Sequence, residues 1–275
     1  MTTWMITGCS KGLGRALAEQ VLKMGSNVVV TARDTDSVKD LVSQYPQSAL
    51  AVSLDVTDAA QIIAAVTATR ERFGGIDVLV NNAGHGYRGA IEEGDPSDVA
   101  ELFATNFFGP VALLKVVLPE MRARRKGAIV NVSSIAGRGS QPGSGYYSAT
   151  KSALETMSDA LRKEVGPLGI KVMVVEPGAF RTDFNGESLQ QTSTIIRDYA
   201  DTAGRRRKEN DTSHGRQPGD PVLGAATIIN VLALPQSPFR LLLGSDAVAF
   251  IRAELQEQVR EIDEWQEVSV STDFS

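Results

Sequence analysis

Short apolar runs alternate with longer amphipathic stretches along most of the chain. Runs rich in valine and isoleucine predict strands, and apolar residues that recur every three or four positions predict helices. The predicted strands are residues 3–7, 27–31, 49–53, 78–80, 128–132, 171–175 and 241–243. The predicted helices are residues 13–24, 37–45, 59–73, 96–105, 111–124, 148–165, 221–234 and 246–260.

Several predicted strands are apolar throughout, as in the VVV run at residues 28–30 and the VMVV run at residues 172–175. An unbroken apolar strand is buried on both faces, which indicates a parallel sheet covered by helices on each side. The alternation of strand and helix continues without a break. We therefore predict one α/β domain over residues 1–275, a doubly wound Rossmann fold with a parallel sheet of about seven strands.

Two segments depart from this pattern. Residues 185–221 are polar, contain a weak helical pattern over residues 189–199, and are predicted to form a substrate lid or insertion. The RRRK run at residues 205–208 is expected to be solvated, with a specific anion or partner site as the alternative. Residues 244–275 are predicted to form a C-terminal helix and tail.

Composition and charge narrow the class of protein. The chain has 28 basic and 33 acidic side chains, a net charge of −5, and so lacks the basic excess that favours nucleic-acid binding. One cysteine, Cys9, and two histidines, His85 and His214, disfavour a disulfide or a zinc cluster, so no metal site is predicted. The absence of a signal peptide and of a run of 18 apolar residues predicts a cytoplasmic protein without a membrane span. Homo-oligomer formation stays open.

The first predicted strand leads into a glycine-rich turn, TGCSKGLG at residues 7–14, that opens the first helix. Glycines let a pyrophosphate approach the backbone, and the helix N-terminus offers it free N–H groups. The spacing G-x-x-x-G-x-G differs from G-x-G-x-x-G, so a purely structural turn is the alternative. The strand–turn–helix context favours a dinucleotide site. Within the turn, Cys9 is expected to be a packed side chain rather than a reactive thiol.

Arg33 follows the second predicted strand, where NAD-binding folds place an acidic residue on the ribose 2′-hydroxyl. An arginine there can instead bind the 2′-phosphate of NADP, and Lys11 adds a second cation. The alternative is a solvated charge at a strand end, and Asp34 puts a carboxylate beside it. We predict NADP(H) as the cofactor.

Tyr147 and Lys151 lie four residues apart, hence on one face of a helix. A nearby ammonium and an oxidised nicotinamide favour the phenolate, so Tyr147 is a candidate acid–base group with a lowered pKa. Ser134 ends a predicted strand, and either hydrogen-bonds a substrate oxygen or caps a helix. Asn106 is a polar residue in an apolar helix, and either satisfies a helix irregularity or holds a relay water.

Together these motifs resemble the short-chain dehydrogenase/reductase family. The resemblance covers about residues 4–243 and also rests on Asp55, on NNAG at residues 81–84 and on Pro177-Gly178. Lys11 and Arg33 are similar to the residues that mark NADP-preferring members of the family. Residues 177–184 look like those of retinol- and hydroxysteroid-dehydrogenase-like members.

This resemblance implies a role for each candidate. Tyr147 would be the catalytic acid–base, Lys151 would lower its pKa and bind the nicotinamide ribose, Ser134 would position the substrate oxygen, and Asn106 would hold the relay water. The residues implied to bind the cofactor are Gly8, Ser10, Lys11, Gly12, Leu13, Gly14, Arg33, Asp55, Val56, Asn82, Ala83, Gly84, Tyr147, Lys151, Pro177, Gly178 and Thr182.

The expected function is an NADP(H)-dependent oxidoreductase that interconverts a small-molecule carbonyl and a primary or secondary alcohol. A dinucleotide-sensing or scaffold protein of the same fold, and a nicotinamide-retaining epimerase or dehydratase, are the alternatives. His85, Tyr87 and Arg88 follow the fourth predicted strand and either line the substrate pocket or form an exposed turn.

Overall fold

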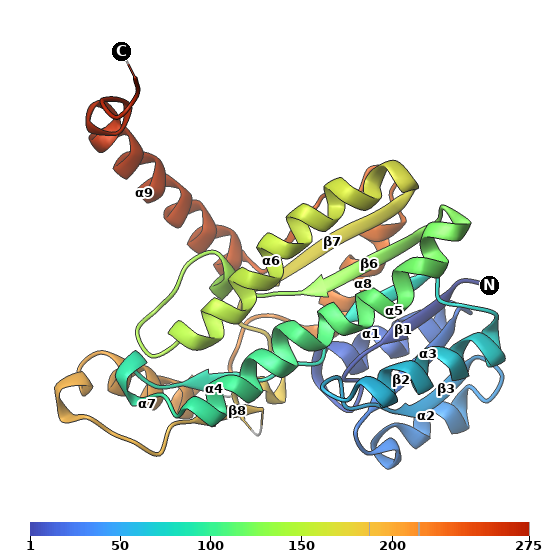
Figure 1. The fold of residues 1–275 in the computed structure, drawn as a ribbon. Coiled ribbons are helices and arrows are strands. Elements are labelled where there is room, and N and C mark those ends of the chain that lie inside the picture. The colour runs from blue at the N-terminus through green and yellow to red at the C-terminus, as the bar shows by residue number, and fades with distance from the viewer. Residues whose placement is uncertain (187, 214, 275) are drawn as a thin grey trace.

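Seven parallel strands form the central sheet of the computed structural model, which describes residues 1–186, 188–213 and 215–274. Across the sheet the order is β3-β2-β1-β4-β6-β7-β9 (Figure 1). In chain order the strands are β1 (Thr3–Ile6), β2 (Asn27–Ala32), β3 (Ala49–Ser53), β4 (Val78–Asn81), β6 (Gly127–Val132), β7 (Ile170–Pro177) and β9 (Arg240–Leu243). The predicted single-domain, doubly wound α/β fold is confirmed.

Successive side chains of each strand enter different cores. In β1, Trp4 and Ile6 pack into the core beneath one face of the sheet, and Met5 packs into the core beneath the other. In β2, Val28 and Val30 pack into the same core as Trp4 and Ile6, and Val29 packs into the same core as Met5. The unbroken apolar runs of the sequence exist because both faces need apolar residues.

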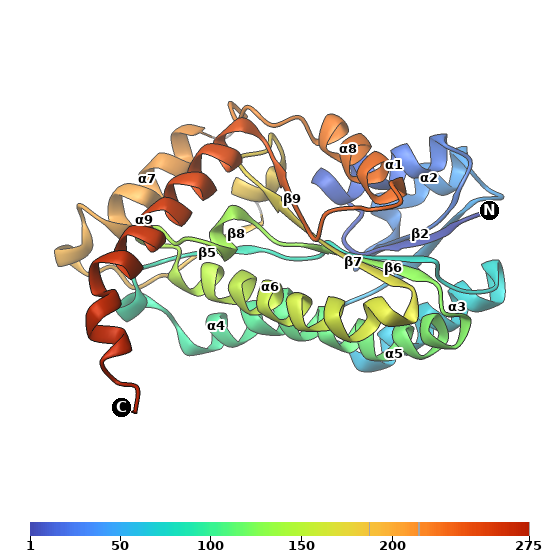
Figure 2. The same cartoon turned by 90° about the horizontal axis from the view of Figure 1, so that it is seen from above.

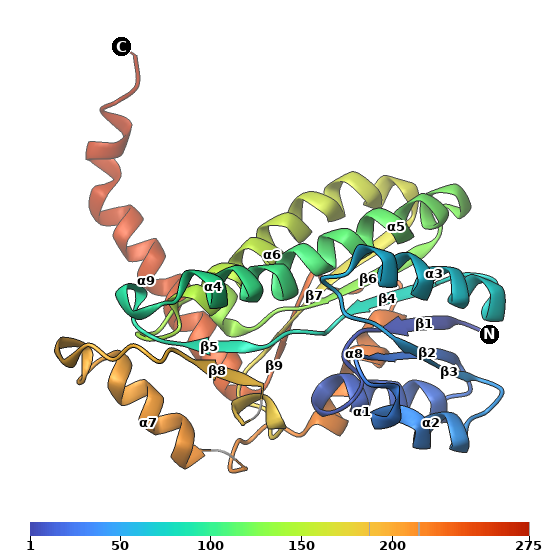
Figure 3. The same cartoon turned by 60° about the horizontal axis from the view of Figure 1, so that its bottom comes forward.

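Helices cover both faces of the sheet (Figures 2 and 3). On one face lie α1 (Gly12–Lys23), α2 (Lys39–Gln44) and α8 (Pro221–Ala233); on the other lie α3 (Ala59–Phe73), α5 (Gly109–Arg124) and α6 (Gly145–Val165). Short 3-10 helices span Thr35–Val38, Ile91–Glu93, Ile135–Gly137, Gly166–Leu168, Asp183–Asn185 and Arg197–Tyr199. The strand order reverses direction between β1 and β4, where doubly wound folds open a ligand crevice.

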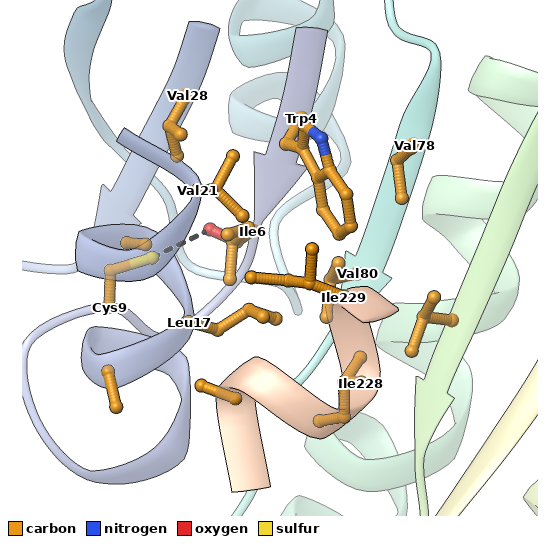
Figure 4. Close-up of a cluster of buried hydrophobic side chains, with 14 of the residues drawn as sticks. Trp4, Ile6, Cys9, Leu17, Val21, Val28, Val78, Val80, Ile228 and Ile229 are labelled. Carbon is orange, nitrogen blue, oxygen red and sulfur yellow. Dashed lines mark hydrogen bonds between the residues drawn. The ribbon is translucent and has the colours of Figure 1, made fainter. Parts of the chain in front are cut away.

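Cys9 belongs to the core beneath the glycine turn. Its thiol is fully buried and donates to the Ile6 carbonyl oxygen at 3.1 Å, close to Leu17 of α1 (Figure 4). Burial raises the pKa of this thiol to about 12, so it is a poor nucleophile at neutral pH. The expectation of a packed, unreactive cysteine is confirmed.

The two separate helices predicted over residues 96–105 and 111–124 form one continuous helical rod. Helix α4 (Pro96–Phe103) continues through a π-helical turn, Ala104–Phe108, into α5. By length and hydropathy alone the stretch Pro96–Arg124 could cross a membrane, although it packs against α3, α6 and β6 as core helices do. The expectation of no membrane span therefore stays a prediction.

The C-terminal helix is longer than predicted. Helix α9 spans Ser245–Val270, ten residues beyond its predicted end, and projects away from the sheet (Figures 1 and 3). No proline or glycine interrupts residues 261–270, which include the strong helix formers Glu261, Glu264 and Glu267. The chain therefore has no local signal that would end the helix earlier.

The polar segment at residues 185–221 folds against strand β5 (Gly86–Arg88). Strand β8 (Leu189–Gln191) pairs with β5 in parallel, and α7 (Ala203–Ser213) follows. The helical pattern predicted over residues 189–199 was wrong at its start, where β8 forms because pairing with a distant strand overrides the local spacing of apolar residues; only Arg197–Tyr199 form a 3-10 helix. The expected solvation of the RRRK run was also wrong in part, since Arg207 forms an ion pair with buried Glu93 at 2.6 Å.

Candidate active site

The carboxyl ends of the sheet strands surround a cavity of about 990 Å³. The predicted site residues that line it are Gly8, Ser10, Lys11, Gly12, Leu13, Arg33, Asp55, Val56, Asn82, Ala83, Gly84, Ser134, Tyr147, Lys151, Pro177, Gly178 and Thr182. Gly14 and Asn106 do not line the cavity, but each contacts residues that do. Parallel strands end at the same edge of a sheet, so residues far apart in sequence converge there.

The glycines of the turn are needed for different physical reasons. Gly8 and Gly12 have φ of +72° and +66°, a region that favours glycine. A Cβ on Gly14 would lie 2.3 Å from Asn82 Nδ2 and 2.4 Å from the Gly8 carbonyl oxygen. Gly14 is therefore required by close packing inside the protein, whereas Gly12 opens onto the cavity with only Thr182 nearby.

The N-terminus of α1 is suited to an anion. Helices α3, α4 and α8 each begin after an aspartate whose carboxylate accepts first-turn N–H groups. At α1 the N-cap is Lys11, which makes no capping hydrogen bond through its side chain, and the first turn contains no acidic residue. Helix N-terminal N–H groups facing a cavity attract phosphate groups. These residues fit the pyrophosphate of a dinucleotide.

Asn82 joins the end of β4 to the glycine turn. Its Nδ2 donates to the carbonyl oxygens of Thr7 at 2.8 Å and of Gly8 at 3.1 Å. The Thr7 hydroxyl accepts in return from the backbone N–H groups of Asn82 and Ala83, both at 2.9 Å. This network fixes the floor of the cavity between β1 and β4.

Arg33 is exposed at the cavity rim, after β2. Asp34 is engaged elsewhere, because its Oδ1 accepts from the Asp36 backbone N–H at 3.0 Å and caps a 3-10 helix. Asp55 is also engaged, since its Oδ1 accepts from the Thr57 N–H at 2.9 Å and the Thr57 hydroxyl at 2.7 Å. At this rim, Arg33 provides an exposed positive charge, and the Asp34 carboxylate caps the 3-10 helix that follows.

Tyr147 and Lys151 lie in the first turns of α6, and both are buried. The Lys151 ammonium donates to the Val132 carbonyl oxygen at 2.9 Å and lies 5.9 Å from the centre of the Tyr147 ring. The Ser134 hydroxyl, at the end of β6, accepts from the Ala136 N–H at 3.1 Å, so its expected capping role is confirmed. The same hydroxyl lines the cavity.

Burial controls the protonation of this pair. It raises the pKa of Tyr147, while the adjacent Ser134 hydroxyl and the positive charge of Arg88 act in the opposite direction. Desolvation therefore outweighs the Ser134 hydroxyl and the charge of Arg88, and the lowered phenol pKa expected from Lys151 together with an oxidised nicotinamide stays a prediction. Burial also lowers the pKa of Lys151 to about 8, which Glu155 opposes. Protonated Tyr147 is suited to donate a proton at neutral pH.

Asn106 occupies the π-helical turn and is buried. Its Oδ1 accepts from the His85 N–H at 3.0 Å, and its Nδ2 donates to the His85 carbonyl oxygen at 2.9 Å and the Thr150 hydroxyl at 3.2 Å. The amide thus connects the loop after β4 to α6, one residue from Lys151. These contacts support the helix-irregularity alternative, and the relay water stays a prediction.

Some residues of the cavity carried no clear signal in the sequence. His85 and Arg88 do line it, whereas Tyr87 is buried beside them, with its hydroxyl accepting from the Asp95 N–H. Arg206 and Arg216, from the polar segment, also line the cavity. Within the described residues no group of three or more acidic, histidine or cysteine side chains is placed to hold a metal ion, and His214 lies outside them.

A buried acidic pair next to the site was also missed. Glu155 lies one turn beyond Lys151 on α6, and its Oε1 accepts from the Ser133 hydroxyl at 2.8 Å. Arg240 contacts both Glu155, at 3.3 Å, and Glu176, at 3.2 Å. The i, i+4, i+8 spacing of Tyr147, Lys151 and Glu155 was the available signal, because it places all three on one helix face.

Comparison with known proteins places this chain among the short chain dehydrogenases. The family model of that description matches residues 2–193. The oxidoreductase BOA17 of Botryotinia fuckeliana is 37% identical over 270 residues, which cover 98% of each chain. The crystal structure of a short-chain dehydrogenase from Streptomyces avermitilis is 43% identical, with a TM-score of 0.93 over 99% of this chain and 100% of the other.

Two less similar structures contain nicotinamide cofactors. ElxO, described with NADP bound, is 28% identical, with a TM-score of 0.73 over 90% of this chain and 99% of its own. A 3-ketoacyl-(acyl-carrier-protein) reductase from Brucella melitensis, complexed with NADH, is 27% identical, with a TM-score of 0.71 over 88% of this chain and 96% of its own. The chain is therefore an oxidoreductase of the short-chain dehydrogenase family that uses a nicotinamide dinucleotide.

Proposed function

We propose that this protein is an NADP(H)-dependent oxidoreductase that interconverts a carbonyl with a primary or secondary alcohol, with Tyr147 as the acid–base. The observation that carries the proposal is the convergence of Ser134, Tyr147 and Lys151 on the cavity that begins at the glycine turn. A protein that only binds a dinucleotide needs the turn but not these three side chains.

When bound, a nicotinamide dinucleotide would supply or accept the hydride at the substrate carbon. Tyr147 donates its phenolic proton to the carbonyl oxygen during reduction and takes it back during oxidation. Ser134 hydrogen-bonds the same oxygen and holds it beside the phenol. Lys151, fixed by the Val132 carbonyl oxygen at 2.9 Å, places positive charge where the phenolate would form.

The preference for NADP rests on charge at the rim of the cavity. Arg33 is exposed there and Lys11 lines the same cavity, while the Asp34 carboxylate is occupied in capping a 3-10 helix. A guanidinium binds a phosphate through paired N–H groups, and Asp34 uses Oδ1 to cap its own 3-10 helix. These contacts support NADP(H) over NAD(H).

The test is NADPH oxidation with a panel of aldehydes, ketones and quinones, using wild type, Tyr147→Phe and Tyr146→Phe. The neighbouring Tyr146 hydroxyl donates to the Ile91 carbonyl oxygen at 2.7 Å and does not line the cavity, so Tyr146→Phe is the matched control. We expect Tyr147→Phe to lower turnover by at least about 100-fold and Tyr146→Phe to retain it. Full turnover in Tyr147→Phe would remove Tyr147 from the acid–base role.

The two alternatives give other outcomes. Tight NADPH binding by wild type without turnover across the panel would favour a dinucleotide-sensing protein. Nicotinamide that stays bound through purification and is not consumed would favour an epimerase or dehydratase.

A further inference from the structure

Arg88 is a buried cation in the wall of the cavity. Its side chain is 6% exposed, on β5, which lies between α6 and α7 (Figures 2 and 3). Its Nη1 donates to the Tyr87 carbonyl oxygen at 3.2 Å, and its Nε has no partner among the described residues. Buried guanidinium groups normally pair with a carboxylate, because an unpaired buried charge is costly.

The charges around Arg88 do not include a compensating carboxylate in the part of the chain that the structure describes. Burial and the positive charge of Arg206 lower the pKa of Arg88 to about 10, and Tyr147 alone acts in the opposite direction. Glu93, on the same side of the molecule, is engaged with Arg207. The acidic residues that line the cavity, none of which shifts this pKa, are Asp55, Glu101, Asp183 and Asp246.

Two glutamines supply a second, independent observation. Gln190 of β8 is paired in register with Tyr87, the residue before Arg88, and its buried Oε1 has no partner among the described residues. Gln217 is 4% exposed, and neither Oε1 nor Nε2 of its amide has a partner within the same residues. Both line the cavity. Buried amides without partners in a cavity wall indicate a polar ligand.

We propose that the substrate carries a carboxylate that binds Arg88, with its reacting carbonyl at Tyr147; this inference rests on the proposed oxidoreductase function. A planar carboxylate matches the guanidinium fork, and Arg206 in the same wall adds a second positive charge. Gln190 and Gln217 offer amide groups to the rest of a polar substrate. The site therefore selects oxo acids over neutral carbonyls.

The experiment compares acids with their neutral esters. Wild type, Arg88→Gln, Arg88→Lys and Arg205→Gln reduce 4-carboxybenzaldehyde, its methyl ester, succinic semialdehyde and the methyl ester of that acid with NADPH. Arg205 is exposed in the same RRRK run and does not line the cavity, so it controls for net charge. The readout is the ratio of kcat/KM for acid to that for ester, which cancels a general loss of folded enzyme.

We expect the acid to be preferred by at least about tenfold in wild type and in Arg205→Gln, mainly through KM. Arg88→Gln should lower that ratio by at least about tenfold, and Arg88→Lys should restore part of it. An equal loss for acid and ester, with a shifted pH profile, would mean that Arg88 acts through Tyr147 and would overturn the proposal. An unchanged ratio in Arg88→Gln would overturn it too.

A binding measurement separates this inference from the proposed function. Calorimetric titration of 4-(hydroxymethyl)benzoate into the NADPH-bound protein needs no turnover, and we expect binding to wild type but not to Arg88→Gln. Binding without turnover would contradict the proposed function alone, and turnover of neutral carbonyls without binding of the acid would contradict the carboxylate site alone. Preference for 4-formylphenyl phosphate over the carboxylate would overturn the choice of carboxylate.

Discussion

The buried Glu93 carboxylate accepts hydrogen bonds from both terminal nitrogens of Arg207, at 2.6 and 3.3 Å. It also accepts from the backbone N–H groups of Ala90 and Ile196, each at 2.8 Å. One side chain therefore attaches the polar segment to the body of the protein at two points, Ile196 and Arg207. These contacts lower the pKa of Glu93 to about 2.

We expect Glu93→Gln to lower the free energy of unfolding at pH 7 by about 3 kcal/mol, because it leaves the Arg207 guanidinium without its counter-charge. The folded carboxyl titrates near 2 and the unfolded one near 4.5, so its contribution is present above pH 4.5 and is lost as the pH falls towards 2. Urea unfolding at pH 7 and pH 3.5 measures both effects. The exposed Glu71→Gln is the control, and equal stability of the two variants would contradict the prediction.

The pKa of Glu176 is shifted in the opposite direction to that of Glu93. Burial and the adjacent Glu155 raise its pKa to about 7, so the folded state holds a proton that the unfolded state releases above about pH 4.5. Stability from this group is present below pH 4.5 and declines as the pH rises through 7. We expect urea midpoints of wild type to fall between pH 5 and 8 and those of Glu176→Gln to stay level by comparison. If the urea midpoints of wild type and Glu176→Gln fall equally with pH, Glu176 is not the source of the pH dependence of stability.

Asn106→Asp tests the amide that connects the loop after β4 to α6. The variant keeps the acceptor for the His85 N–H but loses the donors to His85 and Thr150 and buries a carboxylate. We expect a loss of about 2–3 kcal/mol in unfolding free energy and lower turnover. Thr150→Val removes one acceptor of the amide and the hydroxyl's own donation to the Tyr147 carbonyl oxygen but buries no charge, so it should cost less. Calorimetry and NADPH kinetics measure both, and a fully stable Asn106→Asp would contradict the proposed positioning role.

Arg33→Asp tests the cofactor preference. Replacing the rim cation with a carboxylate should repel the 2′-phosphate and lower the NADPH-to-NADH ratio of kcat/KM by at least about tenfold. Lys23→Asp is the control because it changes the net charge equally at an exposed position away from the cavity. If both variants keep the wild-type ratio, Arg33 does not select the cofactor.

The sheet strands and most covering helices could be predicted because their signals are local. Apolar runs such as residues 28–30 are stable only between two layers of helices, where both faces of the strand are buried. The glycine turn could be predicted because the backbone at Gly8 and Gly12 has a positive φ, which favours glycine. The convergence of Ser134 and Tyr147 on one cavity followed from the rule that parallel strands end at a common edge.

The remaining features depend on contacts between distant residues. Gly86 pairs with Leu189, 103 positions later, and nothing near Leu189 indicates that partner. Arg207 forms its ion pair with Glu93, which lies far away in the sequence, rather than with a neighbour in its own segment. The raised pKa of Tyr147 likewise depends on how completely the fold excludes water, which the spacing from Lys151 does not reveal.

The π-helical turn at Ala104–Phe108 has a consequence for how this region can change in length. Its wide turn holds one extra residue, so everything after it is rotated by about 100° relative to an uninterrupted α-helix. That rotation brings Leu113, Val117 and Met121 of α5 into the core. Removing a single residue here would turn those three side chains away together. An insertion or deletion of one residue at this turn would therefore remove several core contacts of α5 at once, whereas a single substitution affects only the contacts of its own side chain.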